Sequence, residues 1–269
     1  MEPMINVLLK IARNAGEKLV RATDNLDRLK IEEKKLNDYV TEMDRAIEND
    51  IIYNLRKAYP DHAFLGEEGG MQNSVEPSDY LWVIDPIDGT TNYIRGIPHY
   101  AISIACFYKG KPEHGIVLNP ATREEFTASR GRGAQLNGKR IRVSNRKSLD
   151  GALLGTGIPF SNHQQDRMED YLKTLGELAS NCAGIRRPGS AALDLAYVAA
   201  GRFDAFWEMG LQKWDMAAGV LLVLEAGGLV ADFNGGNTYM ESGNIVCGTP
   251  RCFKEVLKIV NQHMVQKKA

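Results

Sequence analysis

The chain has 269 residues, of which 43% are hydrophobic and 25% are charged, and its formal net charge is −1. This length suits one large domain or two tightly joined halves. The near-neutral charge does not predict a nucleic-acid-binding or membrane-surface protein. The sequence shows neither a signal-peptide pattern nor an apolar run near the roughly 20 residues of a membrane helix. Its four cysteines lack C-x-x-C spacing, so we expect a cytoplasmic protein with reduced thiols.

The first sixty residues predict two helices. Apolar residues recur at helical spacing across 4–22. Thr41 is placed to cap a second helix that runs to about Tyr59 and ends at Pro60. From there to about residue 156 the pattern predicts mainly strands, with Asn137-Gly138 as a hairpin turn.

The second half of the chain alternates between helical and strand patterns. This alternation predicts a layered α/β protein. We expect helices at 164–179, 190–200, 214–226 and 250–265, and strands at 184–187, at 203–207 and near Leu229 and Ile245.

Carboxylates gather in three segments where the chain is expected to turn. In the longest, apolar residues run into Asp85, Pro86 fixes the backbone, and Asp88-Gly89 turns the chain. The two carboxylates and the Ile87 carbonyl form an oxygen-only set that suits Mg²⁺. We expect residues 89–91 to open a helical turn whose N–H groups face a phosphate. The three segments are Gly66-Glu67-Glu68-Gly69-Gly70, residues 82–92, and Trp214-Asp215-Met216-Ala217-Ala218-Gly219.

Each of these features alone has a simpler structural interpretation. Asp88-Gly89 is a common surface turn, and Glu67-Glu68 is typical of a solvated loop. Asp215 suits a helix N-cap, and Asp44 suits the first turn of a helix, where the helix dipole favours a carboxylate. Spacing along the sequence does not prove that these groups meet.

Taken together, the motifs resemble the inositol monophosphatase family over essentially the whole chain. Residues 85–92 resemble its long signature, and 214–219 resemble its second one. Residues 66–68 and 38–44 match its other acidic motifs, in the family's order, with one departure at Gly69, where Ser is frequent. The resemblance implies a five-layered αβαβα fold, shared with fructose-1,6-bisphosphatase. It implies one domain built from an N-terminal half, about 1–148, and a C-terminal half, about 149–269.

The resemblance also implies an activity and a set of residues. The activity is Mg²⁺-dependent hydrolysis of inositol 1-phosphate or a related polyol or sugar monophosphate, with lithium inhibition and homodimers common in the family. Two or three Mg²⁺ ions would be bound by Glu67, Asp85, the Ile87 carbonyl, Asp88 and Asp215. Asp44, Thr90 and Glu67 would be catalytic, with Asp44 and Thr90 activating water. Substrate contacts would come from Ile87, Asp88, Gly89, Thr90, Arg186, Gly189, Ser190, Ala191, Glu208 and Asp215.

Two further segments look most like a bacterial branch of this family, namely residues 3–6 and 186–197. That likeness implies a part in transcription antitermination and ribosome assembly, through contacts with Nus factors and RNA polymerase. Residues 130–147 contain seven basic side chains and no acidic one. Such a run could contact RNA or an acidic protein surface, or it could be a solvated hairpin. Both interpretations remain open, and a phosphatase could combine with a regulatory role.

Other enzyme classes fit the sequence less well. An aspartyl-phosphate phosphatase usually shows Asp-x-Asp after a strand, whereas the spacing here is Asp85-x-x-Asp88. Residues 133–139 match P-loop spacing, but Arg140 stands where Ser or Thr should bind Mg²⁺. The five histidines form no spaced metal set, and we expect His99 to be structural. Fructose-1,6-bisphosphatase and bisphosphate nucleotidase activities remain alternatives within the same superfamily.

Overall fold

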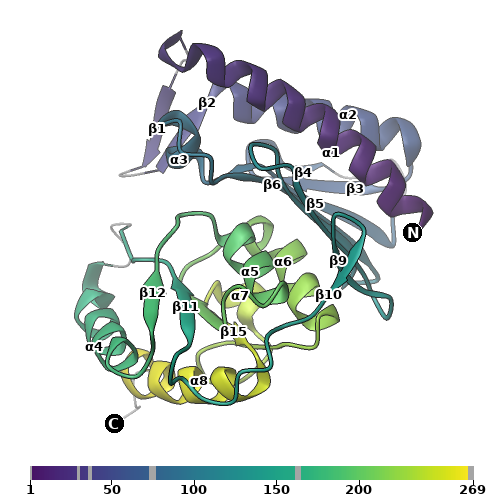
Figure 1. Ribbon diagram of the computed structural model, residues 1–269. Helices are drawn as coiled ribbons and strands as arrows, with labels where there is room; N and C mark the ends of the chain where they lie inside the picture. Colours follow the sequence, from purple (N-terminus) through teal and green to yellow (C-terminus); the bar gives the residue numbers. More distant parts are fainter. Residues whose placement is uncertain (1, 29–30, 36–37, 73–76, 161–164, 266–269) are drawn as a thin grey trace.

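The computed structural model describes residues 2–28, 31–35, 38–72, 77–160 and 165–265. Within these residues a helical pair, an eight-stranded sheet, a second helical layer, a five-stranded sheet and a last helical pair follow one another through the molecule (Figure 1). This order confirms the predicted αβαβα fold. None of the described helices is both long and apolar enough to cross a membrane.

The N-terminal part of the chain builds the upper layers of Figure 1. Its elements are α1 (Pro3–Ala22), a 3₁₀ turn (Thr23–Arg28), β1 (Ile31–Lys35), β2 (Asp38–Thr41), α2 (Glu42–Ala58), β3 (Ala63–Gly66), β4 (Gly70–Gln72), β5 (Tyr80–Asp88), α3 (Thr90–Ile94), β6 (Ala101–Tyr108), β7 (Lys111–Asn119), β8 (Glu124–Ser129), β9 (Gly133–Leu136) and β10 (Lys139–Ile141).

The C-terminal part builds the lower layers. Its elements are β11 (Leu153–Thr156), a 3₁₀ turn (Gln165–Arg167), α4 (Met168–Ala179), β12 (Gly184–Arg186), α5 (Ala191–Ala199), β13 (Ala205–Glu208), α6 (Lys213–Glu225), β14 (Leu229–Ala231), α7 (Tyr239–Ser242), β15 (Ile245–Gly248) and α8 (Pro250–Met264).

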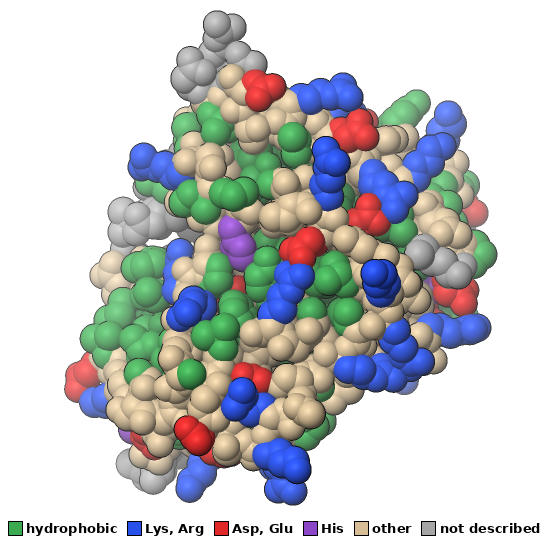
Figure 2. All heavy atoms as spheres, viewed as in Figure 1, with side chains coloured by type: hydrophobic (Ala, Val, Ile, Leu, Met, Phe, Trp, Pro, Cys, Tyr) green, Lys and Arg blue, Asp and Glu red, His purple; other side chains and the backbone are tan. Residues whose placement is uncertain are grey.

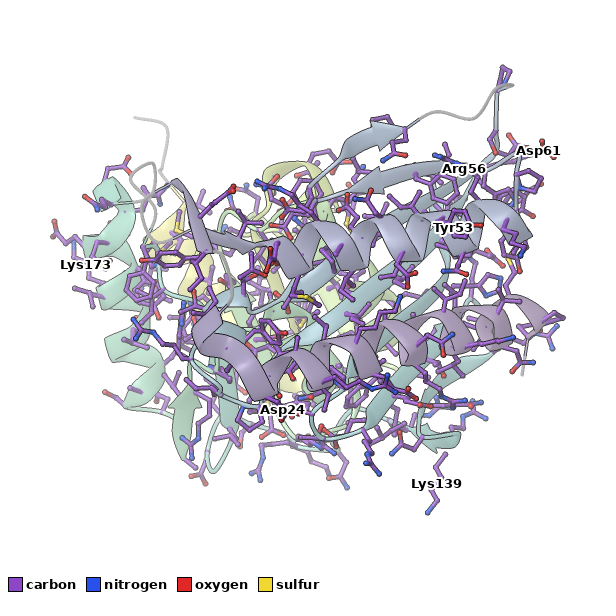
Figure 3. The ribbon with its side chains drawn as sticks, turned by 90° about the horizontal axis from the view of Figure 1, so that it is seen from above. Asp24, Tyr53, Arg56, Asp61, Lys139 and Lys173 are labelled. Atoms are coloured by element: carbon purple, nitrogen blue, oxygen red, sulfur yellow. The ribbon has the colours of Figure 1, made fainter. Side chains whose placement is uncertain are left out.

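Helices α1 and α2 lie side by side across the outer face of the eight-stranded sheet, as the view from above shows (Figure 3). Their apolar faces pack against β3, β5, β6 and β7 in one core, in which Leu8, Leu19 and Ile51 are fully buried. Tyr53 and Arg56 lie on the exposed side of α2 (Figure 3). Helical spacing of apolar residues thus fixes which side of each helix faces the sheet.

The strand order of the eight-stranded sheet is β10-β9-β8-β7-β6-β5-β3-β4. Strand β3 is parallel to β5, whereas the other neighbours are antiparallel. Parallel neighbours end at the same edge of a sheet. Gly66 is therefore level with Ile84, and the Glu67 N–H donates to the Ile84 carbonyl at 3.1 Å. This pairing brings the first two acidic segments together.

The second sheet has the order β12-β11-β13-β15-β14. Helices α5 and α6 fill the space between the sheets and share the largest core with both, while α4 and α8 cover the far face. Helix α6 is apolar on all sides and has eight buried residues, as expected for a helix enclosed in the core. Its first turn nevertheless reaches the edge where the acidic segments lie.

Several elements differ from their predicted bounds. The pair β1–β2 was absent from our prediction because Ile31–Lys35 is mostly charged and lacks the apolar alternation of a half-buried strand. The helix expected from residue 164 begins at Met168 after a 3₁₀ turn, and residue 164 itself lies outside the described residues. The turn at Asn137-Gly138 is confirmed, because both residues have positive φ between paired strands.

Candidate functional site

One cavity of about 160 Å³ lies where the edges of the two sheets face each other. It brings together most of the residues predicted for the metal and the phosphate, although they come from segments more than a hundred residues apart. Its lining consists of Tyr39, Glu67, Asp85, Ile87, Asp88, Gly89, Thr90, Thr91, Asn92, Arg187, Gly189 and Asp215.

The turn after β5 is held in shape by its own side chains. Asp85 Oδ1 accepts a hydrogen bond from the Ile87 N–H at 3.0 Å, within a stretch where the pairing of β5 with β6 is irregular. Gly89 follows with φ +91°, which a side chain disfavours. A Cβ at Gly89 would also stand 3.0 Å from the Gly189 carbonyl oxygen. The predicted sharp turn at Asp88-Gly89 is therefore confirmed, but it is buried rather than on the surface.

Asp88 links the two parts of the molecule. Its Oδ2 accepts hydrogen bonds from the Ser190 hydroxyl and from the Ala192 N–H, the latter at 2.8 Å. Ser190 is the N-cap of α5 and also accepts from the Leu193 N–H. Burial raises the pKa of Asp88 to about 6, although these hydrogen bonds act in the opposite direction. The first turn of α5 thus fixes one oxygen of Asp88.

Asp215 approaches from the first turn of α6, where its Oδ2 accepts from the Gln212 N–H at 2.7 Å. It is thus both a capping residue, the simpler interpretation, and part of the cavity lining. Burial raises its pKa well above the ordinary value, and the negative charge of Asp88 raises it further. Negative charge from the two parts of the chain therefore meets in one place.

Burial and neighbouring negative charges also act on the pKa of Asp85, which is almost fully buried. Burial raises the pKa of Asp85 well above its ordinary value. The charges of Glu67, Asp88 and Asp215 then raise it further, in that order. Among the described residues, no lysine or arginine forms an ion pair with Asp85, Asp88 or Asp215. Buried carboxylates of this kind require a cation or protons.

The donor set fits a hard cation better than a soft one. All of its side-chain donors are carboxylate oxygens, and the Ile87 carbonyl lies beside them. Oxygen-only sets suit Mg²⁺ rather than zinc or copper. In the described part of the chain, no three His, Cys, Asp or Glu side chains form a ready-made metal site.

Asp44 lies just behind the cavity and reaches it through Thr90. Its Oδ2 accepts from the Thr41 N–H at 2.7 Å and from the Thr41 hydroxyl at 2.6 Å. Its Oδ1 lies 3.2 Å from Thr90 Oγ1, which is also 2.9 Å from the Ile87 carbonyl oxygen. A hydroxyl has one proton, so Thr90 can donate to only one of these acceptors at a time. Burial raises the pKa of Asp44.

Glu48 positions the first acidic loop and was missed in the sequence analysis. It is buried in α2, and its two oxygens accept from the Glu68 N–H at 2.8 Å and the Gly69 N–H at 2.7 Å. A Cβ at Gly66 would collide with this carboxylate, and one at Gly69 would lie 2.9 Å from Glu48 Oε1. The signal that could have revealed Glu48 is an acidic residue on the apolar face of a predicted helix.

The residues predicted for the polyol separate into two groups. Gly189 lines the cavity, and Ser190 and Ala191 begin α5 beside it. Arg186 is exposed and is not among the lining residues; its Nη1 donates to the Ile185 carbonyl. Its neighbour Arg187, which the sequence analysis did not select, lines the cavity instead.

Glu208 lies at the end of β13, behind this lining. Its carboxylate occupies the space that a Cβ at Gly157 would take, so this position requires glycine. Burial raises the pKa of Glu208 to about 8, and the Arg187 guanidinium opposes that rise. Asp194 of α5 is also buried. Its Oδ1 has no hydrogen-bond partner in the described structure. Burial raises the pKa of Asp194 well above its ordinary value.

The basic run 130–147 contains the β9–β10 hairpin, and all seven of its basic residues are exposed. Several basic side chains gather at the right of Figure 2, over the end of the molecule that carries β9 and β10. Arg130 pairs with Glu113 at 3.1 Å, and Arg146 pairs with Asp204 at 3.2 Å. The Glu225 carboxylate, at the end of α6, accepts from the N–H groups of residues 131 and 133. Arg130, Arg146 and the backbone of residues 131 and 133 therefore have partners within the fold, and the run stays available at the surface.

The chain matches the model of the inositol monophosphatase family over residues 1–265. It is 60% identical to "Nus factor SuhB" of Pseudomonas aeruginosa and 50% identical to that of Escherichia coli K12, covering 98% and 95% of those proteins and 98% and 96% of this chain. Among solved structures, extragenic suppressor protein suhB of Bartonella henselae superposes with a TM-score of 0.93 at 42% identity, over 97% of this chain and 99% of that one. An IMPase of Thermotoga maritima gives 0.88 at 36% identity over 98% of both. The chain therefore belongs to the inositol monophosphatase family.

Proposed function

We propose that this protein is a Mg²⁺-dependent phosphatase acting on a small polyol or sugar monophosphate such as inositol 1-phosphate. The observation that carries the proposal is the convergence of Glu67, Asp85, Asp88 and Asp215 on one cavity. Membership of the family supports the phosphatase activity. The proposed unit is the whole chain, with its halves at about 1–148 and 149–269, because the cavity takes residues from both.

The proposed metal ligands are the carboxylates of Glu67, Asp85, Asp88 and Asp215, together with the Ile87 carbonyl, for two or three Mg²⁺ ions. When bound, Mg²⁺ neutralises phosphate oxygens, lowers the pKa of water and stabilises the leaving alkoxide. The raised pKa values of Asp85, Asp88 and Asp215 support this assignment, because a cation would remove the repulsion that now favours their protonation.

The proposed proton acceptor for the attacking water is Asp44, acting through Thr90. The Thr90 hydroxyl can donate to Asp44 and still accept from a water in the cavity, so it can orient that water. Hydrogen bonds from Thr41 hold the Asp44 carboxylate in place. Glu67 would contribute to catalysis from the end of β3, next to Asp85 on the parallel strand β5. No covalent phosphoenzyme is needed.

The proposed substrate contacts divide by region. The Gly89 and Thr90 N–H groups would contact phosphate oxygens beside Asp88. The polyol contacts would come from Gly189, Ser190, Ala191 and Glu208, with Arg186. The Glu208 carboxyl suits hydroxyl recognition, because a group with a pKa of about 8 is available as both donor and acceptor near neutral pH.

The proposal is tested by hydrolysis assays after exhaustive metal removal. We expect no turnover without added Mg²⁺, recovery on its addition, and inhibition by Li⁺. Full activity in the stripped protein would contradict the proposal. A panel of inositol 1-phosphate, 4-nitrophenyl phosphate, fructose 1,6-bisphosphate and a nucleoside bisphosphate then separates the monophosphatase from the related bisphosphatase activities.

A second function is proposed from the names of the relatives. Proteins 60% and 50% identical to this chain are called Nus factors, which supports a role beside RNA polymerase. A homodimer is likewise proposed from the family. Pull-down of RNA polymerase–Nus complexes with wild type and Asp88→Asn separates the roles, since the variant should lose hydrolysis and keep its partners. Loss of both in a folded variant would mean that the functions share one site.

A further inference from the structure

Asn92 links the two halves of the chain, and none of the roles assigned above uses it. It is a buried residue of α3 and lines the cavity. Its Nδ2 donates to the His99 carbonyl at 2.7 Å, within the N-terminal half, and to the Pro188 carbonyl at 2.9 Å, in the C-terminal half. The Gly189 carbonyl oxygen also lies 3.5 Å from Nδ2. One amide group therefore holds backbone from both halves.

The hydrogen bonds of this amide show how it can act. An amide NH₂ has two protons, and the His99 and Pro188 carbonyls accept both of them. The three carbonyl oxygens also fix the orientation of the group, because only the nitrogen of the amide can donate to them. Asn92 therefore acts on the position of the backbone rather than by donating to a substrate.

The same two stretches of backbone meet at two other points. A Cβ at Gly89 would stand 3.0 Å from the Gly189 carbonyl oxygen, so the two chains are in close contact there. Asp88 Oδ2 accepts hydrogen bonds from the first turn of α5. Segments 88–92 and 188–192 therefore lie against each other, and the amide described above joins their other ends.

The spacing of these two segments affects the proposed metal site. Asp88 belongs to the N-terminal half, whereas Asp215 reaches the same cavity from the C-terminal half. Mg²⁺ demands near-ideal octahedral geometry, with oxygen ligands at about 2.0–2.1 Å. A small shift of one half against the other would therefore weaken Mg²⁺ binding by ligands that come from both.

We propose that Asn92 is a positioning residue, which holds segment 188–192 against segment 88–92 and so keeps the carboxylates of the two halves at the spacing that Mg²⁺ requires. This inference rests on the proposed phosphatase function and adds a residue that binds neither metal nor substrate. A residue that only stabilised the fold would lower the free energy of unfolding and leave the affinity for Mg²⁺ unchanged.

The test measures the Mg²⁺ requirement of Asn92→Ala. The Mg²⁺ concentration for half-maximal activity should rise about 10- to 100-fold, the range for residues that orient metal ligands. At saturating Mg²⁺, kcat should be largely retained. The change should be equal for inositol 1-phosphate and 4-nitrophenyl phosphate, because Asn92 acts on the metal site and not on the leaving group. Calorimetric titration of Mg²⁺ into the protein without substrate should show the same loss of affinity.

Two further variants complete the test. Asn92→Ser keeps one donor and should change the affinity for Mg²⁺ in the same direction by a smaller factor, which keeps the test open if Asn92→Ala does not fold. Asn119→Ala is the matched control, since it removes another buried amide and should lower stability without changing the affinity for Mg²⁺. All the listed partners of this control side chain lie in the N-terminal half, namely Pro98, Ala121 and Thr122.

Different outcomes distinguish failure of this inference from failure of the proposed function. If the wild type hydrolyses neither substrate with Mg²⁺, the proposed function fails. If the wild type is active but Asn92→Ala loses stability with an unchanged affinity for Mg²⁺, Asn92 only supports the fold. An equal loss of affinity in Asn119→Ala would overturn the link between the halves. A loss confined to inositol 1-phosphate would place the effect at the leaving group and also contradict the inference.

Discussion

The two sheets supply the candidate site in different ways. The eight-stranded sheet places Glu67 and Asp85 on adjacent strands, where the parallel register of β3 and β5 brings them together. The five-stranded sheet contributes through the helices beside it, because Ser190 caps α5 and Asp215 lies in the first turn of α6. Asp85 follows a long apolar run that marks its place in the sequence, whereas an acidic residue in the first turn of a helix, such as Asp215, also matches an ordinary capping role. A sequence therefore reveals the first kind more readily.

This difference suggests that the two regions have different roles in the site. The residues around β2, β3 and β5 include Thr90, which lines the cavity where we propose that the phosphate binds, and Asp44, which lies beside Thr90. From the second half of the chain, Arg187 and Gly189 line the same cavity, and Glu208 lies at the end of β13. We therefore expect changes in the first group to act on kcat and changes in the second to act on the choice of substrate.

The largest effect should come from Asp44→Asn. The variant keeps the shape of the side chain but removes the proton acceptor, so kcat should fall on the order of 10²–10⁴-fold. Mg²⁺ and phosphate should still bind, because Asp44 is not part of the cavity lining. Steady-state kinetics and calorimetry measure the two quantities separately.

A pair of substitutions at Thr90 provides the control for this prediction. Thr90→Ser keeps the hydroxyl beside Asp44 and should remain active, whereas Thr90→Val should resemble Asp44→Asn. A near-normal kcat in Asp44→Asn would remove this residue from the mechanism. If Asp44→Asn instead raised only the KM for inositol 1-phosphate, Asp44 would act on the choice of substrate. The two regions would then not have the separate roles expected above.

A smaller effect concerns stability without metal. The pKa of Asp88 is raised to about 6 from an ordinary value near 3.8, so its contribution to the free energy of unfolding is present below about pH 4 and is lost as the pH rises through 6. A rise of this size corresponds to on the order of 3 kcal/mol. Asp85 and Asp215 act in the same direction. The free energy of unfolding of the metal-free protein should therefore fall as the pH rises from about 4 to 8, because these groups lose their protons.

Asp88→Asn isolates this contribution from the rest of the protein. His99 and His114 have lowered pKa values and act oppositely, because their neutral forms are favoured in the fold. The difference between wild type and Asp88→Asn in denaturant unfolding at each pH cancels their effect. That difference should grow in favour of the variant as the pH rises, and Mg²⁺ should reverse it. A difference independent of pH would show that Asp88 does not titrate in this range.

Local patterns predicted a layered α/β protein and the acidic segments, whereas the order of the five layers and most of the site residues were implied by the family resemblance. Apolar periodicity indicated the helices, and four apolar residues before Asp85 indicated the strand end. The resemblance implied Arg186 and not Arg187, although Arg187 lines the cavity, because no local pattern distinguishes neighbouring residues of one type. The partners of the basic run were also missed, since Glu225 lies about ninety residues away along the chain. Long-range pairing of charges leaves no local pattern.

The smallest predicted effect concerns Glu48, which accepts hydrogen bonds from the loop that carries Glu67. In Glu48→Gln, an amide NH₂ replaces one of the two oxygens that accept from residues 68 and 69, so two donors face each other in a buried place. The loop carrying Glu67 should shift, and the Mg²⁺ concentration for half-maximal activity should rise about tenfold, as for other residues that orient metal ligands. At saturating Mg²⁺, kcat should be largely retained. Activity and calorimetric titrations with Mg²⁺ measure the change.

Asp50→Asn, on the same helix, is the matched control. Asp50 pairs with Lys18 at 2.9 Å in a partly exposed position, so its loss should change stability by about 0.5 kcal/mol or less and leave the Mg²⁺ requirement unchanged. Glu48→Gln should lower stability by about 1–3 kcal/mol, the cost of an unsatisfied buried group. If it lowers stability without altering the Mg²⁺ requirement, Glu48 supports the fold alone. The strand-end carboxylates would then be positioned by sheet register, without help from α2.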